Sequence, residues 1–344
     1  MNRKNKNSVL ILVACLLAVV VIGILVMTIA KVNQEDYTPN YDEDKVQTDA
    51  DAGDTDSDGS LFGDNVISDS DYEEYFGDGE TEGYIGTAEI DGEDCPLLVY
   101  DGLSYCIVGD HAEVVYTFFS EDDRESYTIL SSVEYDGTVY SVTTIDDDAF
   151  YTFLDVTQID IPDSVTTIGD SAFAGCEALV SITFPDSVVS MGDYVLGDCT
   201  ALVHVDMPDR LLEFGEEMFF NDTLLEEVIL PSELKSLPAE TFSGCEALIK
   251  VDIPASVTAI GDECFWYCEA LEELVLPESL VAIGDRCFYD CMALKEITIP
   301  QSVESLGDDL FDCCDELTVV RVPESRVEKY AEEFEGYDFE VVGY

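Results

Sequence analysis

The chain has 344 residues, of which 14 are lysine or arginine and 76 are aspartate or glutamate, so its formal net charge is -62 at pH 7. A field of this sign repels nucleic acid and anionic membrane surfaces. The charge therefore excludes nucleic-acid binding from the expected functions and leaves basic patches and divalent cations as partners that the chain would attract.

An uncharged, apolar run over residues 8–30 is long enough to cross a bilayer as one helix. Three basic residues precede the run and one, Lys31, follows it directly, which predicts that residues 1–7 are cytoplasmic. A signal peptide cut after Thr28–Ala30 is the alternative, but its apolar core would be shorter. An uncleaved, single-pass anchor is favoured, with the rest of the chain outside the cell.

Residues 31–86 are rich in aspartate, glutamate, glycine, serine and threonine, and such a composition cannot bury enough apolar surface to fold. We expect a disordered acidic linker. Within it, Asp54–Asn65 has the spacing of half a calcium loop, but Asn65 stands where a bidentate carboxylate is needed. A chance match is therefore favoured over a weak ion site, and no metal and no cofactor is predicted.

Residues 87–138 show alternating apolar side chains interrupted by the turn pairs Asp101-Gly102 and Asp136-Gly137. This pattern predicts a β-rich unit. We interpret it as the N-terminal cap of the repeats that follow, because the end of a repeat stack would otherwise expose a hydrophobic face. Cys95 and Cys106 in this unit are candidates for one disulfide.

A proline recurs every 23 residues in the remainder of the chain, and a fixed period of this size indicates a solenoid. The prolines are Pro162, Pro185, Pro208, Pro231, Pro254, Pro277, Pro300 and Pro323. With a degenerate copy that begins at Val139, residues 139–322 hold eight predicted repeats. Residues 323–344 are the expected C-terminal cap, with a helix over Glu324–Phe334 and a strand over Phe339–Val342.

Positions within a repeat, counted from the proline as zero, indicate which side chains face inward. Position 17 is always leucine, position 11 is phenylalanine except at Leu196, and position 20 is apolar. Positions 17, 20 and 22 therefore read as the inner side of a short strand, with positions 19 and 21 facing outward. Position 7 is glycine except at Pro238, which predicts positive φ or a close backbone approach.

The residues between positions 8 and 14 predict a short helical turn with an acidic residue at its start. Position 14 is cysteine in six repeats and Asp222 in one. A buried column of thiols is favoured there over disulfides. The spacing of Cys264, Cys268, Cys287 and Cys291 would suit zinc, but packing of small residues explains them as well.

The segment Ile161–Pro185, IPDSVTTIGDSAFAGCEALVSITFP, resembles the repeat of bacterial surface proteins of the BspA type, IPxSVTxIGxxAFxxCxxLxxIxIP. The resemblance extends over about residues 97–344. It implies an α/β solenoid built as a right-handed stack of leucine-rich repeats, and it implies a binding scaffold that adheres to host or neighbouring-cell surfaces. A fold of this kind carries no particular activity by itself.

No catalytic motif stands out in the sequence, which has two histidines and so many carboxylates that any pair of them is uninformative. We therefore predict that the chain is not an enzyme. The expected binding surface is the concave sheet, because solenoids bind on that face. Its candidate residues are His204, Asp206, Lys250, Asp252, Glu273, Lys295, Glu296 and Arg321.

A second candidate set is aromatic and follows the turn at positions 12 and 13. Its members are Phe220, Trp266, Tyr267 and Tyr289. Tyrosine and tryptophan are enriched in binding hot spots, but packing between repeats is the slightly favoured reading.

The function predicted from these features is a cell-surface module that binds an extracellular protein or glycan, most simply in adhesion. The alternative is a structural envelope or matrix protein that associates with itself when divalent cations bridge its acidic surface.

Overall fold

The structure, a computed structural model, describes residues 83–90, 93–116 and 124–344. The predicted membrane segment, the calcium-like loop and nearly all of the predicted acidic linker lie outside these residues. Within the described ranges, no helix combines the length and apolar character needed to cross a bilayer. The first described strand begins at Gly83, inside the segment predicted as linker.

The N-terminal part of the described chain is a β unit that continues into the repeats. Its strands are β1 (Gly83–Ile90), β2 (Glu93–Tyr100), β3 (Leu103–Val108), β4 (His111–Val115), β6 (Ser132–Tyr135) and β7 (Thr138–Ile145). Strands β1 to β4 are antiparallel neighbours, β6 and β7 form a hairpin, and β4 pairs with β7 in parallel. Cys95 and Cys106, the candidates for one disulfide, are buried in one small cluster, and the structure has no disulfide between them.

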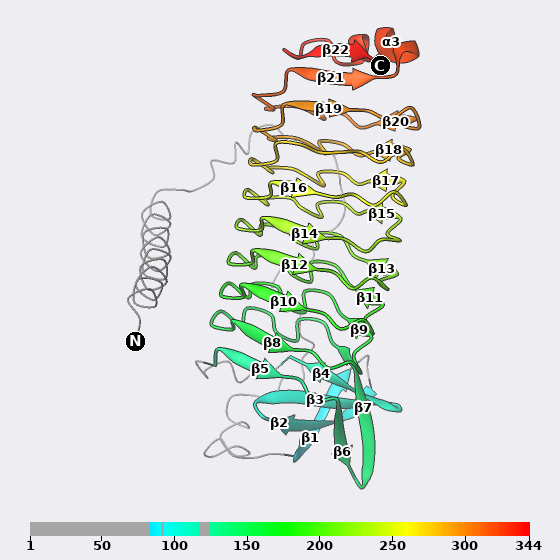
Figure 1. Cartoon of the computed structure of the whole chain (residues 1–344). Coiled ribbons are helices and arrows are strands. Elements are labelled where there is room, and N and C mark those ends of the chain that lie inside the picture. The colour runs from blue at the N-terminus through cyan, green and yellow to red at the C-terminus, as the bar shows by residue number, and fades with distance from the viewer. Residues whose placement is uncertain (1–82, 91–92, 117–123) are drawn as a thin grey trace, which may run out of the picture. The chain divides into compact units, whose positions relative to one another are not determined.

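The 23-residue repeats form stacked coils, and their strands form two ladders that run along the stack (Figure 1). The first ladder contains β5 (Ser126–Thr128), β8 (Gln158–Asp160), β10 (Ser181–Thr183), β12 (His204–Asp206), β14 (Glu227–Ile229), β16 (Lys250–Val251), β19 (Glu296–Thr298), β21 (Val319–Val322) and β22 (Glu340–Gly343). The second ladder continues from β7 through β9 (Thr167–Ile168), β11 (Ser190–Met191), β13 (Glu213–Phe214), β15 (Ser236–Leu237), β17 (Ala259–Ile260), β18 (Ala282–Ile283) and β20 (Ser305–Leu306).

Paired strands of the coils are parallel, and their register places equal positions of successive repeats side by side. Ser181 faces His204, which faces Glu227, which faces Lys250. In the first ladder the central residue of each three-residue strand is buried and positions 19 and 21 are open to solvent. The predicted inward and outward positions of this strand are confirmed.

No helix is present at positions 8–14, where a helical turn was predicted, and this part of each coil is a run of tight turns with two left-handed residues. Ser171 at position 9 has φ 54° and Gly175 at position 13 has φ 70°. The N–H groups of Ser171, Phe173 and Gly175 donate to carbonyls of the next coil at 2.8–3.0 Å. Because these groups bond between coils, no helix forms here, and the repeats make a β-solenoid.

The acidic residue at position 8 has a different role from the one predicted at a helix start. Asp170 Oδ1 accepts a hydrogen bond from the Asp193 backbone N–H at 2.8 Å, and Asp262 Oδ1 accepts one from Asp285 in the same way. Asp147 and Asp285 repeat the contact. This column of carboxylates therefore links neighbouring coils.

The glycine at position 7 is required by close approach of neighbouring coils, and its φ is not positive. A Cβ on Gly284 would lie 2.4 Å from the Asp262 nitrogen, and one on Gly215 would lie 2.0 Å from the Gly192 oxygen. Real Cβ atoms do not tolerate such contacts, so only glycine permits this spacing of coils.

The core consists of columns in which one side-chain type stacks on itself. Phe219 and Phe242 stack with ring centroids 5.4 Å apart, and the stack continues through Phe265, Phe288 and Phe311. The cysteines of position 14 are free, and their thiols donate to the phenylalanine carbonyls of the preceding coil at 3.0–3.3 Å. Burial raises the pKa of these thiols, so they act as packing residues.

The C-terminal cap closes the hydrophobic end of the stack. A short 3₁₀ helix, η1 (Glu324–Arg326), leads into the helix α3 (Val327–Glu333), and β22 then pairs in parallel with β21. Phe334 and Phe339 cover the ring of Phe311, with centroid distances of 5.5 and 5.7 Å. The predicted helix and final strand of this segment are therefore present.

Candidate functional site

The second ladder is interrupted between β13 and β15. On one side of the break, Val189 N–H donates to Thr166 and Leu212 N–H donates to Val189, each at 2.9 Å. On the other side the series resumes with Thr258 N–H donating to Lys235 at 2.9 Å. Accordingly, β13 is the last strand of one sheet and β15 is the first strand of another.

The cause of the break is Pro238, which occupies the glycine position of its coil. In most other coils the glycine N–H donates to the coil before, as Gly261 does to Leu237 at 2.8 Å. Proline has no N–H to donate, and its ring occupies space where even a single Cβ is too close. The carboxylate of position 8 in the coil before belongs to Glu216, and among the described residues it accepts no hydrogen bond from the Ala239 N–H. Both links are therefore missing at this junction, and the two coils are next joined where the Glu217 N–H donates to the Ala239 carbonyl at 3.0 Å.

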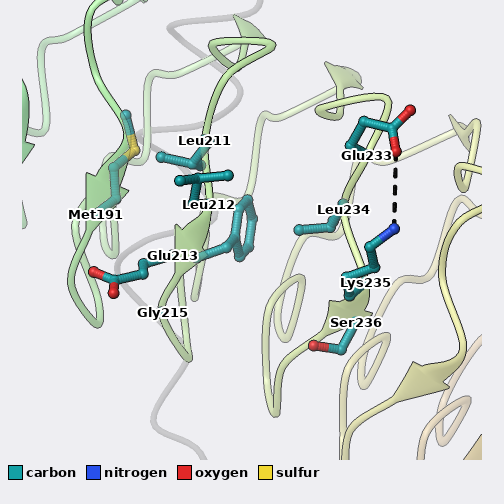
Figure 2. Close-up of a pocket in the computed structure, with 10 residues that line it drawn as sticks. Met191, Leu211, Leu212, Glu213, Gly215, Glu233, Leu234, Lys235 and Ser236 are labelled. Atoms are coloured by element: carbon teal, nitrogen blue, oxygen red, sulfur yellow. Dashed lines mark ion pairs between the residues drawn. The ribbon is translucent and has the colours of Figure 1, made fainter.

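The break opens a pocket of about 460 Å³ between β13 and β15 (Figure 2). Its lining residues are Met191, Leu211, Leu212, Glu213, Phe214, Gly215, Glu233, Leu234, Lys235 and Ser236. Leu212 is 83% exposed and Phe214 is half-buried, so one wall presents apolar side chains to solvent. Leu234 is buried in the opposite wall.

The charged groups at the pocket are mainly acidic. Glu213 is exposed and accepts a hydrogen bond from the Ser190 hydroxyl at 2.5 Å. Glu233 lies 3.8 Å from Lys235, and the dashed line in Figure 2 marks this ion pair. Because Lys235 is paired within the pocket wall, the negative charge of Glu213 dominates the remainder of the rim.

The candidate residues of the first ladder are exposed or half-buried, and their positive charges are paired. Lys250 lies 2.7 Å from Asp252, and Lys295 Nζ lies 2.7 Å from a carboxylate oxygen of Glu272. The remaining candidates pair as follows: Arg321 with Glu296 at 3.1 Å, and His204 with Asp206 at 2.9 Å. The basic candidates of this face are thus neutralised by nearby acids.

The predicted strand around Glu273 is absent, since residues 271–277 of the described chain have no regular secondary structure. Glu273 itself is exposed. The first ladder is consequently divided, with β16 ending one sheet and β19 beginning another. The predicted continuous sheet is therefore discontinuous at this coil.

Three of the four aromatic candidates form one half-buried cluster. The Trp266 ring lies 4.8 Å from Tyr267 and 6.5 Å from Tyr289, measured between centroids. A hydrogen bond with Cys313 is the main cause that raises the pKa of Tyr289 to about 12, and burial adds to it. Phe220 packs elsewhere, 5.8 Å from Tyr194. These contacts join successive coils, as the packing interpretation expects.

The pocket was not among the sites predicted from the sequence, although its signal was present. Pro238 and Ala239 are consecutive departures from the repeat frame. From the sequence, Pro238 was identified only as the exception at the glycine position. In a repeat protein, a proline at a position whose N–H links neighbouring coils predicts a local separation of coils.

The match to known proteins agrees with this geometry. The model of the BspA type leucine-rich repeat region matches residues 143–272 and 258–339, with six copies. A leucine-rich repeat protein from Bacteroides ovatus is 26% identical over 71% of this chain and 76% of its own, with a TM-score of 0.52. A leucine-rich cell surface protein from Faecalibacterium prausnitzii is 27% identical over 66% of this chain and 54% of its own, with a TM-score of 0.46. No curated protein matches the chain.

The residues matched by the family model make up more than half of the chain. They include the stacked phenylalanines, the cysteine column and the close glycines that hold the coils together. The chain therefore belongs to the BspA-type leucine-rich repeat family.

Proposed function

We propose that this chain is a cell-surface binding module that attaches to proteins or glycans of host or neighbouring cells. The observation that carries the proposal is the register of the first ladder, which aligns exposed residues of successive coils into one surface. Solenoids use such repeated surfaces to bind extended partners. The family match supports a binding role of this kind.

The exposed surface of the first ladder favours a partner that carries both basic and apolar groups. Ile229 is 51% exposed and Val275 is 79% exposed, and both occupy outward position 21. Acidic residues surround them, while Lys250 and Arg321 are already paired with acids. A partner with exposed lysine or arginine beside apolar side chains would complement this surface.

Display outside the cell is part of the proposal, and it rests on the predicted anchor at residues 8–30. Protease added to intact cells that carry the full chain should remove the repeats while a cytoplasmic marker remains uncut. Repeats that stay intact while a known surface protein is digested would refute the proposed location.

The binding role is tested with cells that display the full chain and with cells from which it is deleted, on arrays of matrix proteins, mucins and glycans. We expect selective attachment only with the chain present. A variant with Ile229→Ser and Val275→Ser should weaken attachment if the first ladder is the contact surface. A second variant with Trp266→Ala and Tyr289→Ala tests the aromatic cluster. Equal attachment of the displaying and deleted cells would contradict the proposal.

A further inference from the structure

We infer that the pocket at the β13–β15 break binds one apolar side chain of a basic peptide segment of the partner. This inference rests on the proposed function, because it gives the binding module a specific partner chemistry. Among the described coils, every other junction on this side has a glycine N–H bond or a carboxylate bond, and only the junction before Pro238 lacks both.

The shape of the pocket fits a side chain. Its volume of about 460 Å³ lies within the range of ordinary ligand sites. Leu212 and Phe214 line one wall, and Leu212, at 83%, has the largest exposed fraction of the exposed large apolar residues in the described chain. An inserted leucine or phenylalanine would remove this apolar surface from water, which is the main favourable contribution to such contacts.

The charge selects the residues that flank the inserted side chain. At the pocket Glu233 is paired with Lys235, so Glu213 leaves a net negative charge there, and the whole chain carries a net charge of -62. A second copy of this chain, or its own acidic linker, would be repelled from the site. Lysine or arginine beside the apolar side chain would instead be attracted and would be guided to the pocket.

The backbone at the break favours an extended peptide as the occupant. In regular coils the N–H of position 4 donates to the preceding coil, as Thr258 does to Lys235. Among the described residues, Lys235 N–H makes no such bond to Leu212. The two strand edges therefore face the opening with polar groups that an added extended segment can use.

The test uses the full chain in detergent micelles and a fluorescent pentapeptide with one leucine between two pairs of lysines. Two comparison peptides carry alanine in place of leucine, or glutamates in place of lysines. We expect the leucine peptide to bind about tenfold more tightly than the alanine peptide, as a buried anchor requires. We expect the glutamate peptide not to bind, and we expect binding to weaken as salt is raised.

Three variants locate the bound peptide. Pro238→Gly returns the N–H and removes the ring, so it should close the break and reduce leucine-peptide binding about tenfold. Leu212→Ser should lower affinity similarly, and its exposed position keeps the fold intact. Leu154→Ser removes another exposed apolar side chain, outside the residues that line the pocket, and should leave binding unchanged. Circular dichroism verifies that each variant is folded.

Equal binding of the leucine and alanine peptides would overturn the inference, since charge alone would then explain the affinity. Unchanged binding by both Pro238→Gly and Leu212→Ser would overturn it as well, as would a glycan that binds at this pocket in place of the peptide. The attachment assay distinguishes failure of this inference from failure of the proposed function. If only the pocket inference is wrong, cells displaying the Pro238→Gly variant would still attach. If the proposed function is wrong, cells displaying the unaltered chain would not attach either.

Discussion

At the scale of single residues, Asp222 is the clearest departure from the repeat frame. It occupies the cysteine position, is fully buried, and neither of its carboxyl oxygens has a hydrogen-bond partner in the described chain. Burial raises the pKa of Asp222 well above its ordinary value, and the charge of Asp198 adds to the shift. Burial therefore favours the neutral form of this carboxyl group, as it favours the neutral thiols of the same column.

Replacing Asp222 by cysteine should stabilise the protein at neutral pH. The folded state raises the pKa of Asp222, so it binds a proton that the unfolded state releases above about pH 4. Stability is therefore lost as pH rises from there toward the folded-state pKa, at up to about 1.4 kcal/mol per pH unit. We expect Asp222→Cys to raise the free energy of unfolding by about 2–4 kcal/mol at pH 7.5, measured by urea titration under reducing conditions.

The same measurement at pH 5 is the control, because other carboxyl groups titrate alike in both proteins. The gain from Asp222→Cys should be about 2–3 kcal/mol smaller at pH 5 than at pH 7.5. An equal gain at both pH values would show that the difference in stability between the Asp222 protein and the Asp222→Cys variant comes from packing and not from ionisation of Asp222.

At the scale of the elements, the two ladders depend on how closely neighbouring coils approach. The glycine column sets this distance in the second ladder, and the phenylalanine column fills the space between the ladders. Where the glycine is replaced, at Pro238, the sheet divides and a pocket appears. One position in the repeat thus decides whether this side is continuous.

Gly284→Ala should destabilise the stack by about 1–3 kcal/mol, because the added Cβ would lie 2.4 Å from the Asp262 nitrogen and the coils would have to separate. Thermal unfolding measures the effect. Glu278→Ala, at an exposed position of the same coil, is the matched control and should change stability little. If the two variants unfold at the same temperature, the close approach of the coils at Gly284 does not determine the stability of the stack.

Phe242→Ala should cost about 3–5 kcal/mol, since Phe242 is fully buried between the rings of Phe219 and Phe265. Phe242→Leu should cost much less, because Leu196 already fills the same position in another coil. Urea unfolding compares the two variants. A leucine variant as unstable as the alanine variant would mean that ring stacking, rather than filled volume, stabilises the column.

At the scale of the whole molecule, 76 acidic and 14 basic residues repel one another and oppose compaction. The described ion pairs are exposed or partly exposed and contribute little each, so they do not remove this repulsion. The acidic field therefore acts on stability, solubility and choice of partner together.

Added sodium chloride should raise the thermal midpoint of the full chain by several degrees between 20 and 500 mM, because it screens this repulsion. Calcium chloride at matched ionic strength is the comparison, and we expect a similar rise. A much larger rise with calcium, together with assembly that a chelator reverses, would instead favour the alternative of a cation-bridged envelope protein.

The sequence alone determined the period, the inward columns and the caps, because a 23-residue repeat can bury its apolar face only by stacking on identical neighbours. The positions of Leu271 and Phe265 in the core, and the outward strand positions, followed from that requirement. Cys268, which was expected in a buried column of thiols, is fully buried and donates to the Phe242 carbonyl.

Only the tertiary structure decided the conformation of positions 8–14 and the pocket beside Pro238. A local pattern favoured a helical turn near Phe173, but that stretch bonds to the next coil, and no local rule contains those partners. The same holds for Asp170, whose carboxylate accepts from Asp193, 23 residues away. The pocket forms where two successive coils lack the hydrogen bonds that join other coils. Its position therefore depends on how the coils stack, which the tertiary structure shows.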